Sequence, residues 1–240
     1  MTTIKESLIG IMYPRRCPIC GNIVIPKSES ACVKCRLKLN PIQEPRCKKC
    51  SKPLLNEEQE YCFDCQRQQH HYEKGYAVYT YEESIKDSLI QYKFYGKREF
   101  AKFYVESIIS ELGDKLLRLQ PDVIVPVPLH KRKLRIRGFN QAELLAKGIG
   151  DALSIPLHTD WLERVKYTTP QKKLNDKERL RNLERAFLCR ADTNDIIGKC
   201  ILLVDDIYTT GSTIEACTRV LLQAGCSKVY FVTICIGKGF

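Results

Sequence analysis

The sequence predicts an α/β domain in which helices flank a mostly parallel sheet, preceded by a small cysteine-rich module. Three observations predict this fold. Apolar or β-branched runs alternate with stretches of helical periodicity through residues 75–240. The run at residues 200–204 is continuously apolar, which is typical of a strand buried on both faces. Eight of the 13 cysteines lie between Cys17 and Cys65, so we expect the module at residues 1–67 and the α/β domain at residues 75–240.

Four Cys-x-x-Cys pairs follow one another in the module, and the unit C-x2-C-x11-C-x2-C repeats with a 30-residue period. Each pair forms a tight knuckle, and two knuckles supply the four sulfur ligands of a tetrahedral zinc site. The sites offer no open coordination position, so we expect two structural zinc ions. The predicted ligands are Cys17, Cys20, Cys32, Cys35, Cys47, Cys50, Cys62 and Cys65.

Alternatives to this interpretation are disulfides, which need an oxidising compartment, and iron–sulfur clusters, for which the even double-knuckle repeat is atypical. The pairing of knuckles also has two solutions. Each repeat is complete alone, which favours sequential sites, while a cross-braced arrangement would pair the first knuckle with the third. We expect the other five cysteines to be small buried hydrophobic residues: Cys189, Cys200, Cys217, Cys226 and Cys235.

Chain length, apolar stretches and net charge narrow the class of protein further. The 240 residues suit one small module and one domain of about 170 residues. No stretch approaches the roughly 18 apolar residues of a membrane span, and the N-terminus lacks the pattern of a signal peptide. We therefore expect a soluble, cytoplasmic protein. The formal net charge is +11. It falls to about +7 with two zinc–thiolate sites, which still favours phosphate-rich partners.

The chain between the module and the first predicted strand is polar. Residues 66–74 have the composition of a linker, and we expect His70 and His71 to lie in solvent, since the cysteine sets are complete. Basic residues around the knuckles form either a solvated surface that offsets the thiolate charge or a face for nucleic acid.

The helices and strands of the second domain follow in order. Residues 75–81 alternate and are rich in Tyr and Val, which predicts a strand. Residues 85–92 and 100–116 carry apolar residues at helical spacing, and residues 123–127 form a short apolar strand. The last strand is expected at residues 228–235.

Three capping boxes, each a polar residue followed three positions later by glutamate, predict where helices begin. They start at Asn140, Asn175 and Ser212, and the helix from Ser212 is expected to run to Gly225.

The buried strand carries two neighbouring carboxylates, Asp205 and Asp206, at its C-terminal end, where ligands of open α/β sheets bind. These carboxylates can accept hydrogen bonds from vicinal ribose hydroxyls or stand near Mg²⁺. The next residues open a helix, and its backbone N–H groups suit a phosphate monoester. This predicted phosphate loop comprises Thr209, Thr210, Gly211, Ser212 and Thr213.

Two further segments are rich in cations, and one of them also contains aromatic residues. Residues 131–137 hold five cations, which suit either a pyrophosphate or a DNA backbone. Residues 92–98 interleave aromatics with cations. That pattern either stacks single-stranded bases or marks a helix end whose aromatics lie in the core.

Residues 201–213 resemble the phosphoribosyl pyrophosphate (PRPP) signature of type I phosphoribosyltransferases. Residues 125–130 and 137–146 resemble the competence protein F (ComF) family, as do several positions within residues 169–187. Cysteine knuckles before such a domain are a trait of this family. The chain departs from the pattern in its metal count, because some members need only one zinc, and this leaves the role of the second site open.

The resemblance implies a type I phosphoribosyltransferase-like fold and a set of residue roles. Asp205 and Asp206 would hold the ribose hydroxyls, and the phosphate loop would hold the 5′-phosphate, with Mg²⁺ accompanying PRPP. Leu129 and His130 would lie where pyrophosphate binds. The segment that overhangs the site would contribute Gln171, Arg179 and Arg181.

The resemblance also implies a function. A ComF-like protein would assist import of single-stranded DNA during natural transformation, beside a helicase-like ATPase that could hold it at the inner face of the membrane. The alternative is an active phosphoribosyltransferase that transfers the phosphoribosyl group of PRPP to a nitrogen acceptor. The sequence shows no recognisable pocket for an acceptor base, so we assign no catalytic residue and leave enzymatic activity open.

Overall fold

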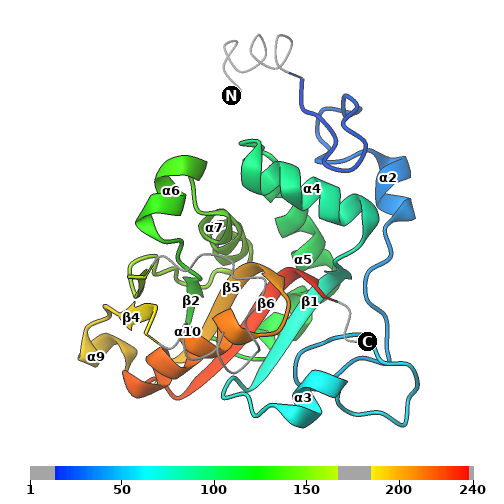
Figure 1. Cartoon of the computed structure of the whole chain (residues 1–240). Coiled ribbons are helices and arrows are strands. Elements are labelled where there is room, and N and C mark those ends of the chain that lie inside the picture. Colours follow the sequence, from blue (N-terminus) through cyan, green and yellow to red (C-terminus); the bar gives the residue numbers. More distant parts are fainter. Residues whose placement is uncertain (1–13, 167–184, 238–240) are drawn as a thin grey trace.

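The computed structural model describes residues 14–166 and 185–237, and a parallel sheet forms its centre (Figure 1). The sheet has four strands in the order β1-β6-β5-β2, and a separate two-stranded antiparallel sheet pairs β3 with β4. This confirms the predicted α/β class with a parallel sheet. The strands are β1 (Lys74–Thr80), β2 (Val123–Pro126), β3 (Leu162–Arg164), β4 (Phe187–Cys189), β5 (Cys200–Tyr208) and β6 (Lys228–Ile236).

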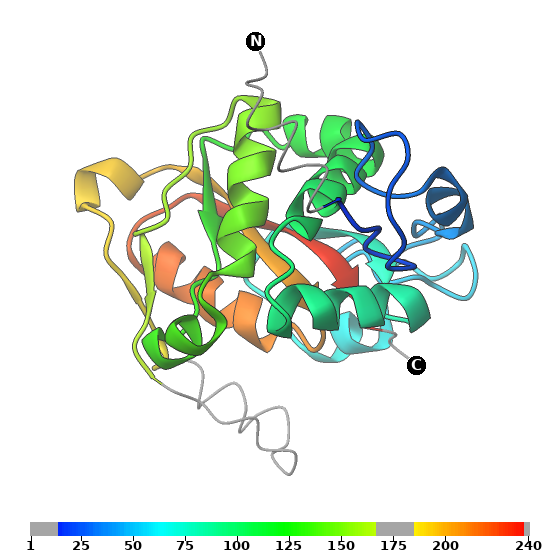
Figure 2. The same cartoon turned by 90° about the horizontal axis from the view of Figure 1, so that it is seen from above.

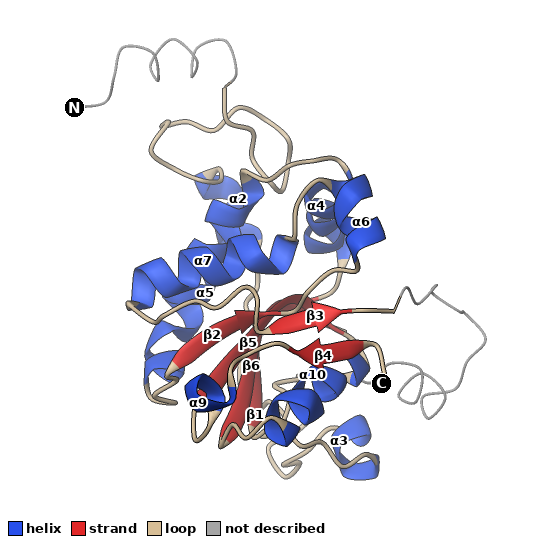
Figure 3. Cartoon of the chain, turned by 90° about the vertical axis from the view of Figure 1, so that its left-hand side faces the viewer, coloured by secondary structure: helices blue, strands red, loops and turns tan. Residues whose placement is uncertain are grey.

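Helices cover both faces of the parallel sheet. Figure 3 shows α5 and α7 on one face and α10 on the other. The apolar spacing predicted α4 and α5 correctly, because their inward positions, such as Leu89 and Leu112, are buried. The helices are α4 (Glu83–Phe94), α5 (Phe100–Leu117), α6 (Lys131–Arg137), α7 (Gln141–Leu153), α9 (Thr193–Ile196) and α10 (Ser212–Gln223). No helix among the described residues is long and apolar enough to cross a membrane.

Strand β5 is longer than the apolar run predicts. Its parallel pairing with β6 continues from Cys200 opposite Lys228 to Tyr208 opposite Ile236. The two aspartates lie near the C-terminal end of the strand, as predicted, and the strand continues to Tyr208. A hydrophobicity pattern misses this extension because backbone pairing between strands does not require apolar side chains. Polar side chains are found at strand ends that face a binding site and not the core.

The predicted helix starts have different outcomes. Asn140 caps α7, since its side chain accepts a hydrogen bond of 3.2 Å from the backbone N–H of Ala142. Ser212 is not a cap: Gly211, with φ of +79°, precedes α10, and Ser212 is its first helical residue. The Glu215 side chain points to other partners. The helix ends at Gln223, and the start predicted at Asn175 lies outside the described residues.

The 30-residue sequence repeat is also a structural repeat. Gly21 N–H bonds to Cys17 O, and Ser51 N–H bonds to Cys47 O, each at 2.9 Å. A short helix follows the third cysteine of each unit: α2 (Val33–Lys38) and α3 (Phe63–Arg67). We call residues 14–39 the first cysteine unit and residues 44–67 the second. Figure 2 shows the first unit, in dark blue, beside α4 and α5.

The segment after the second cysteine unit is not a solvated linker. His70 is 8% exposed and Tyr72 is fully buried, so the expectation that His70 lies in solvent is wrong. The His71 side chain remains partly exposed but contacts Glu215 of α10. This packing depends on a residue more than 140 positions away, which no local pattern reveals. The domain limits at residues 67 and 75 remain a prediction.

Gly75 of β1 provides a stability prediction. A Cβ atom there would lie 1.9 Å from Cζ of Phe231, a ring buried in the neighbouring strand. We expect Gly75→Ala to lower the free energy of unfolding by about 1–3 kcal/mol, the usual effect of overpacking. Urea denaturation monitored by circular dichroism measures this.

The matched control is Gly113 in the middle of α5. Its added Cβ would be 3.7 Å from Ile109 Cγ2, an ordinary contact. We expect Gly113→Ala to raise stability by about 0.5–1 kcal/mol, because alanine loses less backbone entropy in a helix. Equal effects of the two substitutions would contradict the packing described for Gly75.

Candidate sugar-phosphate site and cysteine clusters

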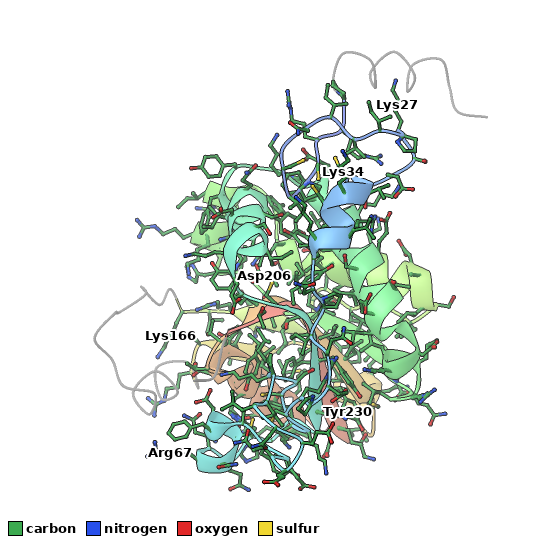
Figure 4. The ribbon with its side chains drawn as sticks, turned by 90° about the vertical axis from the view of Figure 1, so that its right-hand side faces the viewer. Lys27, Lys34, Arg67, Lys166, Asp206 and Tyr230 are labelled. Atoms are coloured by element: carbon green, nitrogen blue, oxygen red, sulfur yellow. The ribbon has the colours of Figure 1, made fainter. Side chains whose placement is uncertain are left out.

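Asp205 and Asp206 lie side by side at the C-terminal part of β5, and both are buried. The backbone N–H of Asp206 donates to Oδ1 of Asp205 at 2.8 Å. Lys93 Nζ, from α4, donates to Oδ1 of Asp206 at 2.7 Å. Oδ2 of Asp206 is buried and has no hydrogen-bond partner. Figure 4 shows Asp206 in the region between α4 and the sheet, where a ligand hydroxyl could satisfy this oxygen.

Cations from three elements surround the two carboxylates. Burial lowers the pKa of Arg137, against the opposing effect of the charges on Asp206 and Asp205. Burial also lowers the pKa of Lys133, and the nearby charges of Arg164, Arg137 and Lys93 add to this. Lys93, Arg137 and Arg164 therefore act on the two carboxylates, and Lys133 lies near these three cations. The excess of positive charge suits a ligand with several phosphate groups.

Three of these four cations lie in segments that the sequence marks as cationic, and only Arg164 does not. Arg137 and Lys133 belong to the basic run at residues 131–137, but Arg164 stands alone on β3. Its pKa is lowered by burial, and the charge of Asp205 acts on it. Lys93 lies in the aromatic and cationic segment at residues 92–98, which offered a signal, whereas the sequence contains none for Arg164.

The carboxyl group of Asp205 is a weaker acid than an ordinary aspartate, and this affects the pH dependence of stability. Burial and then the charge of Asp206 raise the pKa of Asp205 to about 7. The folded protein therefore keeps this proton across a pH range, from about 4 to 7, in which the unfolded chain releases it. Stability of the wild type should fall as pH rises through this range.

We expect Asp205→Asn to remove this contribution. The free energy of unfolding of the variant, compared with that of the wild type, should increase steadily from pH 4 to pH 7 and then level off. Urea denaturation at a series of pH values measures it. A difference that is independent of pH would show that Asp205 ionises normally in the folded protein.

The predicted phosphate loop follows directly. Thr210 Oγ1 and Ser212 Oγ lie 2.9 Å apart, and Gly211 turns the chain into the start of α10. The first backbone N–H groups of a helix have no partner within the helix, so hydroxyls and N–H donors meet at this turn. Thr209 is exposed, and Thr213 is half-buried. Their roles as ligand-binding residues remain predictions.

Leu129 and His130 connect β2 to α6. Nδ1 of His130 accepts a hydrogen bond of 3.1 Å from Arg132 N–H and caps this helix. The loop begins beside β5, because Val127 N–H bonds to Val204 O at 2.9 Å. It therefore starts at the same end of the sheet as the aspartates. The predicted overhanging residues Gln171, Arg179 and Arg181 lie outside the described residues.

The aromatic and cationic segment is divided between core and surface. Tyr92 is fully buried, whereas Phe94 is 67% and Tyr95 is 71% exposed. The guanidinium of Arg137 lies 5.0 Å from the centre of the Phe94 ring. Tyr92 therefore belongs to the core, whereas Phe94 and Tyr95 lie at the surface, and base stacking on these exposed rings remains a prediction.

The cysteine sulfurs form two separate clusters. Within each, the ligand atoms lie within 4.8 Å of one another, and the clusters are sequential, so the cross-braced alternative is wrong. The Sγ atoms of Cys20 and Cys32 are 3.9 Å apart, and those of Cys50 and Cys62 are 3.6 Å apart. A tetrahedron with zinc–sulfur bonds of about 2.3 Å has edges of about 3.8 Å, so both clusters fit zinc. They support two structural zinc sites.

Comparisons with known proteins agree with this geometry. Residues 8–66 match the double zinc ribbon domain family, and residues 102–239 match the phosphoribosyl transferase domain family. Competence protein F of Haemophilus influenzae is 30% identical over 167 residues, covering 68% of this chain and 72% of that protein. Competence protein ComFC of Bacillus subtilis is 32% identical over 152 residues, covering 62% and 58%. DNA utilization protein YhgH of Escherichia coli K12 is 31% identical over 162 residues, covering 66% and 70%.

Proposed function

Because this chain belongs to the competence protein F family, with a phosphoribosyl transferase domain after a double zinc ribbon, we propose that it binds a phosphoribosyl ligand and assists import of single-stranded DNA. The observation that carries the proposal is the pair of buried aspartates at the end of β5, which lies near four cations and is followed by a hydroxyl-lined helix start.

Each chemical group of PRPP would have a partner at this site. Its ribose hydroxyls would donate to Asp205 and Asp206. Oδ2 of Asp206 has no hydrogen-bond partner and needs a donor. Its 5′-phosphate would accept from the phosphate loop, and its pyrophosphate would lie by Leu129 and His130, near Arg137 and Lys133. A Mg²⁺ ion bound with PRPP would add charge neutralisation near the carboxylates.

Isothermal titration with PRPP and Mg²⁺ tests the binding site. We expect measurable affinity in the wild type and a loss of at least about tenfold in Asp205→Asn/Asp206→Asn, since charge-assisted hydrogen bonds contribute about 1.5–3 kcal/mol each. Asp122→Asn is the control, because Asp122 Oδ2 accepts from Cys200 N–H at the opposite end of β5. An unchanged affinity in the double variant would overturn the site.

Single-stranded DNA would bind beside this site. We define the α4–α6 surface as Phe94, Tyr95, Lys97, Arg98, Lys131 and Arg135. Its aromatics are exposed, and Arg98 Nη2 donates to Gly138 O at 2.6 Å, which joins the end of α4 to the end of α6. Exposed aromatics stack bases and cations bind the backbone. Lys93 and Arg137 lead from this surface to the aspartates, so the terminal nucleotide of a strand could reach the sugar-phosphate site.

Fluorescence anisotropy with a labelled oligothymidine tests this surface. We expect Phe94→Ala/Tyr95→Ala to weaken binding by about 1–3 kcal/mol per stacked base. Affinity should also fall with rising salt. The control is Phe63→Ala, which removes an exposed aromatic from the second cysteine unit. A larger loss of affinity in Phe63→Ala would indicate that the DNA binds the zinc ribbon and not the α4–α6 surface.

The competence role includes a helicase-like ATPase partner and a cytoplasmic location at the inner face of the membrane. Only the family membership supports these parts. Deletion of the gene in a transformable host should reduce transformation and leave DNA uptake at the cell surface unaffected.

A working phosphoribosyltransferase is the second candidate, because the chain contains the phosphoribosyl transferase domain. Such an enzyme would position PRPP so that a nitrogen acceptor displaces pyrophosphate from C1, with the surrounding cations stabilising the leaving group. Pyrophosphate release in the presence of purine and pyrimidine bases tests this. Release by the wild type, abolished in Asp205→Asn/Asp206→Asn, would establish enzymatic activity.

A further inference from the structure

The two cysteine units pack on opposite faces of the parallel sheet. Cys17, Val24 and Ala31 of the first unit belong to the apolar cluster that contains α4 and α5. Cys47 and Cys50 of the second unit belong to the other cluster, which contains α10. Figure 4 shows this separation, with Lys34 of the first unit at one end of the molecule and Arg67 of the second at the other.

Of the two cysteine units, as far as the structure describes them, only the second shares an apolar cluster with the residues that support the phosphate loop. Its cysteines Cys47, Cys50 and Cys62 share an apolar cluster with Tyr72 and Tyr208. The hydroxyl groups of Tyr72 and Tyr208 are 2.7 Å apart and hydrogen-bonded. The Tyr208 ring stacks on Phe231 with a centroid separation of 4.9 Å.

Tyr208 in turn lies directly against the turn of the phosphate loop. A Cβ atom at Gly211 would be 2.3 Å from the Tyr208 hydroxyl oxygen, so this hydroxyl occupies the space beside Gly211. Gly211 has φ of +79°, a conformation that determines the direction of the first N–H groups of α10. A shift of the Tyr208 side chain would therefore move the loop.

A second connection joins the same unit to α10. His71 follows α3 by four residues, and its backbone N–H donates to Glu215 Oε2 at 2.9 Å. Arg219 Nε donates to Glu215 Oε1 at 2.7 Å, so this buried carboxylate ties the segment after the second unit to the first turns of α10. Burial acts to raise the pKa of Glu215, but the His70 ring, whose Nδ1 lies 3.7 Å from Oε2, and hydrogen bonds from Arg219 and His71 lower it to about 2.

From these contacts we infer that the second cysteine unit, loaded with zinc, positions the phosphate loop through Tyr72 and Tyr208, whereas the first unit does not. Tyr72 and Tyr208 are positioning residues: they contact the loop or its support and not the ligand. The second zinc site then has a role that the first, on the other face of the sheet, lacks. This role of the second zinc site rests on the proposed function only in the experiment that measures PRPP affinity.

Hydrogen exchange of the full-length, zinc-loaded protein tests the inference without a ligand. We expect Tyr72→Phe to speed exchange of the amides at residues 208–213 by roughly fivefold, the factor for one buried hydrogen bond. Tyr79→Phe is the control, since Tyr79 is a buried tyrosine of β1 in the opposite cluster. Equal exchange of this loop in the two variants would overturn the inference.

The repeat supplies a second matched pair. Cys65→Ser weakens zinc binding in the second unit, and Cys35→Ser, 30 residues earlier, weakens it in the first. We expect faster loop exchange only in Cys65→Ser, with zinc content of each variant measured by atomic emission. Equally fast loop exchange in Cys65→Ser and Cys35→Ser would contradict the inference. If either variant unfolds, the comparison of Tyr72→Phe with Tyr79→Phe decides.

Ligand titration separates this inference from the proposed function. PRPP affinity should fall about fivefold in Tyr72→Phe and remain unchanged in Tyr79→Phe. If the wild type binds no PRPP, the proposed function fails, and the exchange comparison still decides the inference. If the wild type binds PRPP and Tyr72→Phe changes neither exchange nor affinity, the inference alone fails.

Discussion

Replacing Lys93 with methionine is expected to destabilise the protein by about 3–5 kcal/mol, because it leaves a buried charge without its partner. Lys93 Nζ is 2.7 Å from Asp206 Oδ1, and the Asp206 side chain is 3% exposed. The second carboxylate oxygen of Asp206 already lacks a hydrogen bond, and Asp205 lies next to it. For a chain of this size the melting temperature should fall by about 10 °C or more.

A double-mutant cycle measures the coupling. Asp206→Asn alone should also destabilise, and Lys93→Met/Asp206→Asn should cost clearly less than the sum of the single substitutions. Lys97→Met serves as the control, since Lys97 pairs with Glu99 at 3.8 Å on the surface and should contribute at most about 1 kcal/mol. If Lys93→Met costs no more than Lys97→Met, the described ion pair does not stabilise the folded state.

Removing zinc is expected to unfold the whole chain and not the cysteine-rich segment alone. Cys17, Cys47 and Cys50 are fully buried within the two apolar clusters that also hold the helices of the α/β domain. Structural zinc contributes about 10–16 kcal/mol in zinc-finger peptides, which is as large as the entire stability of a typical domain, about 5–15 kcal/mol.

Thermal unfolding followed by circular dichroism, with and without a strong zinc chelator, checks this. We expect one transition with zinc, no cooperative transition in the presence of the chelator, and recovery of the transition when zinc is added back. From the sequence alone we would expect only the N-terminal module to unfold. A second transition that keeps its original temperature in the presence of chelator would support that simpler picture and contradict the shared packing.

The sequence by itself determined the class of fold, the metal sites and the main elements of the candidate ligand site. These features depend on local spacing. Two residues between cysteines predict a knuckle, four-residue spacing predicts α5, and an apolar run followed by Asp205 and Asp206 predicts a strand that ends at a site. Each follows from the geometry of a few neighbouring residues, which the chain order fixes.

Tertiary structure decided which distant segments meet. Tyr72 and Tyr208 are 136 residues apart, and His71 and Glu215 are 144 apart, yet both pairs are in contact. The sequence could not reveal that the charge of Asp205 acts on Arg164 or that the two cysteine units lie on opposite faces of the sheet. Such contacts arise because the apolar faces of distant segments are buried against one another in shared clusters, and that constraint acts on the whole molecule and not on any short segment.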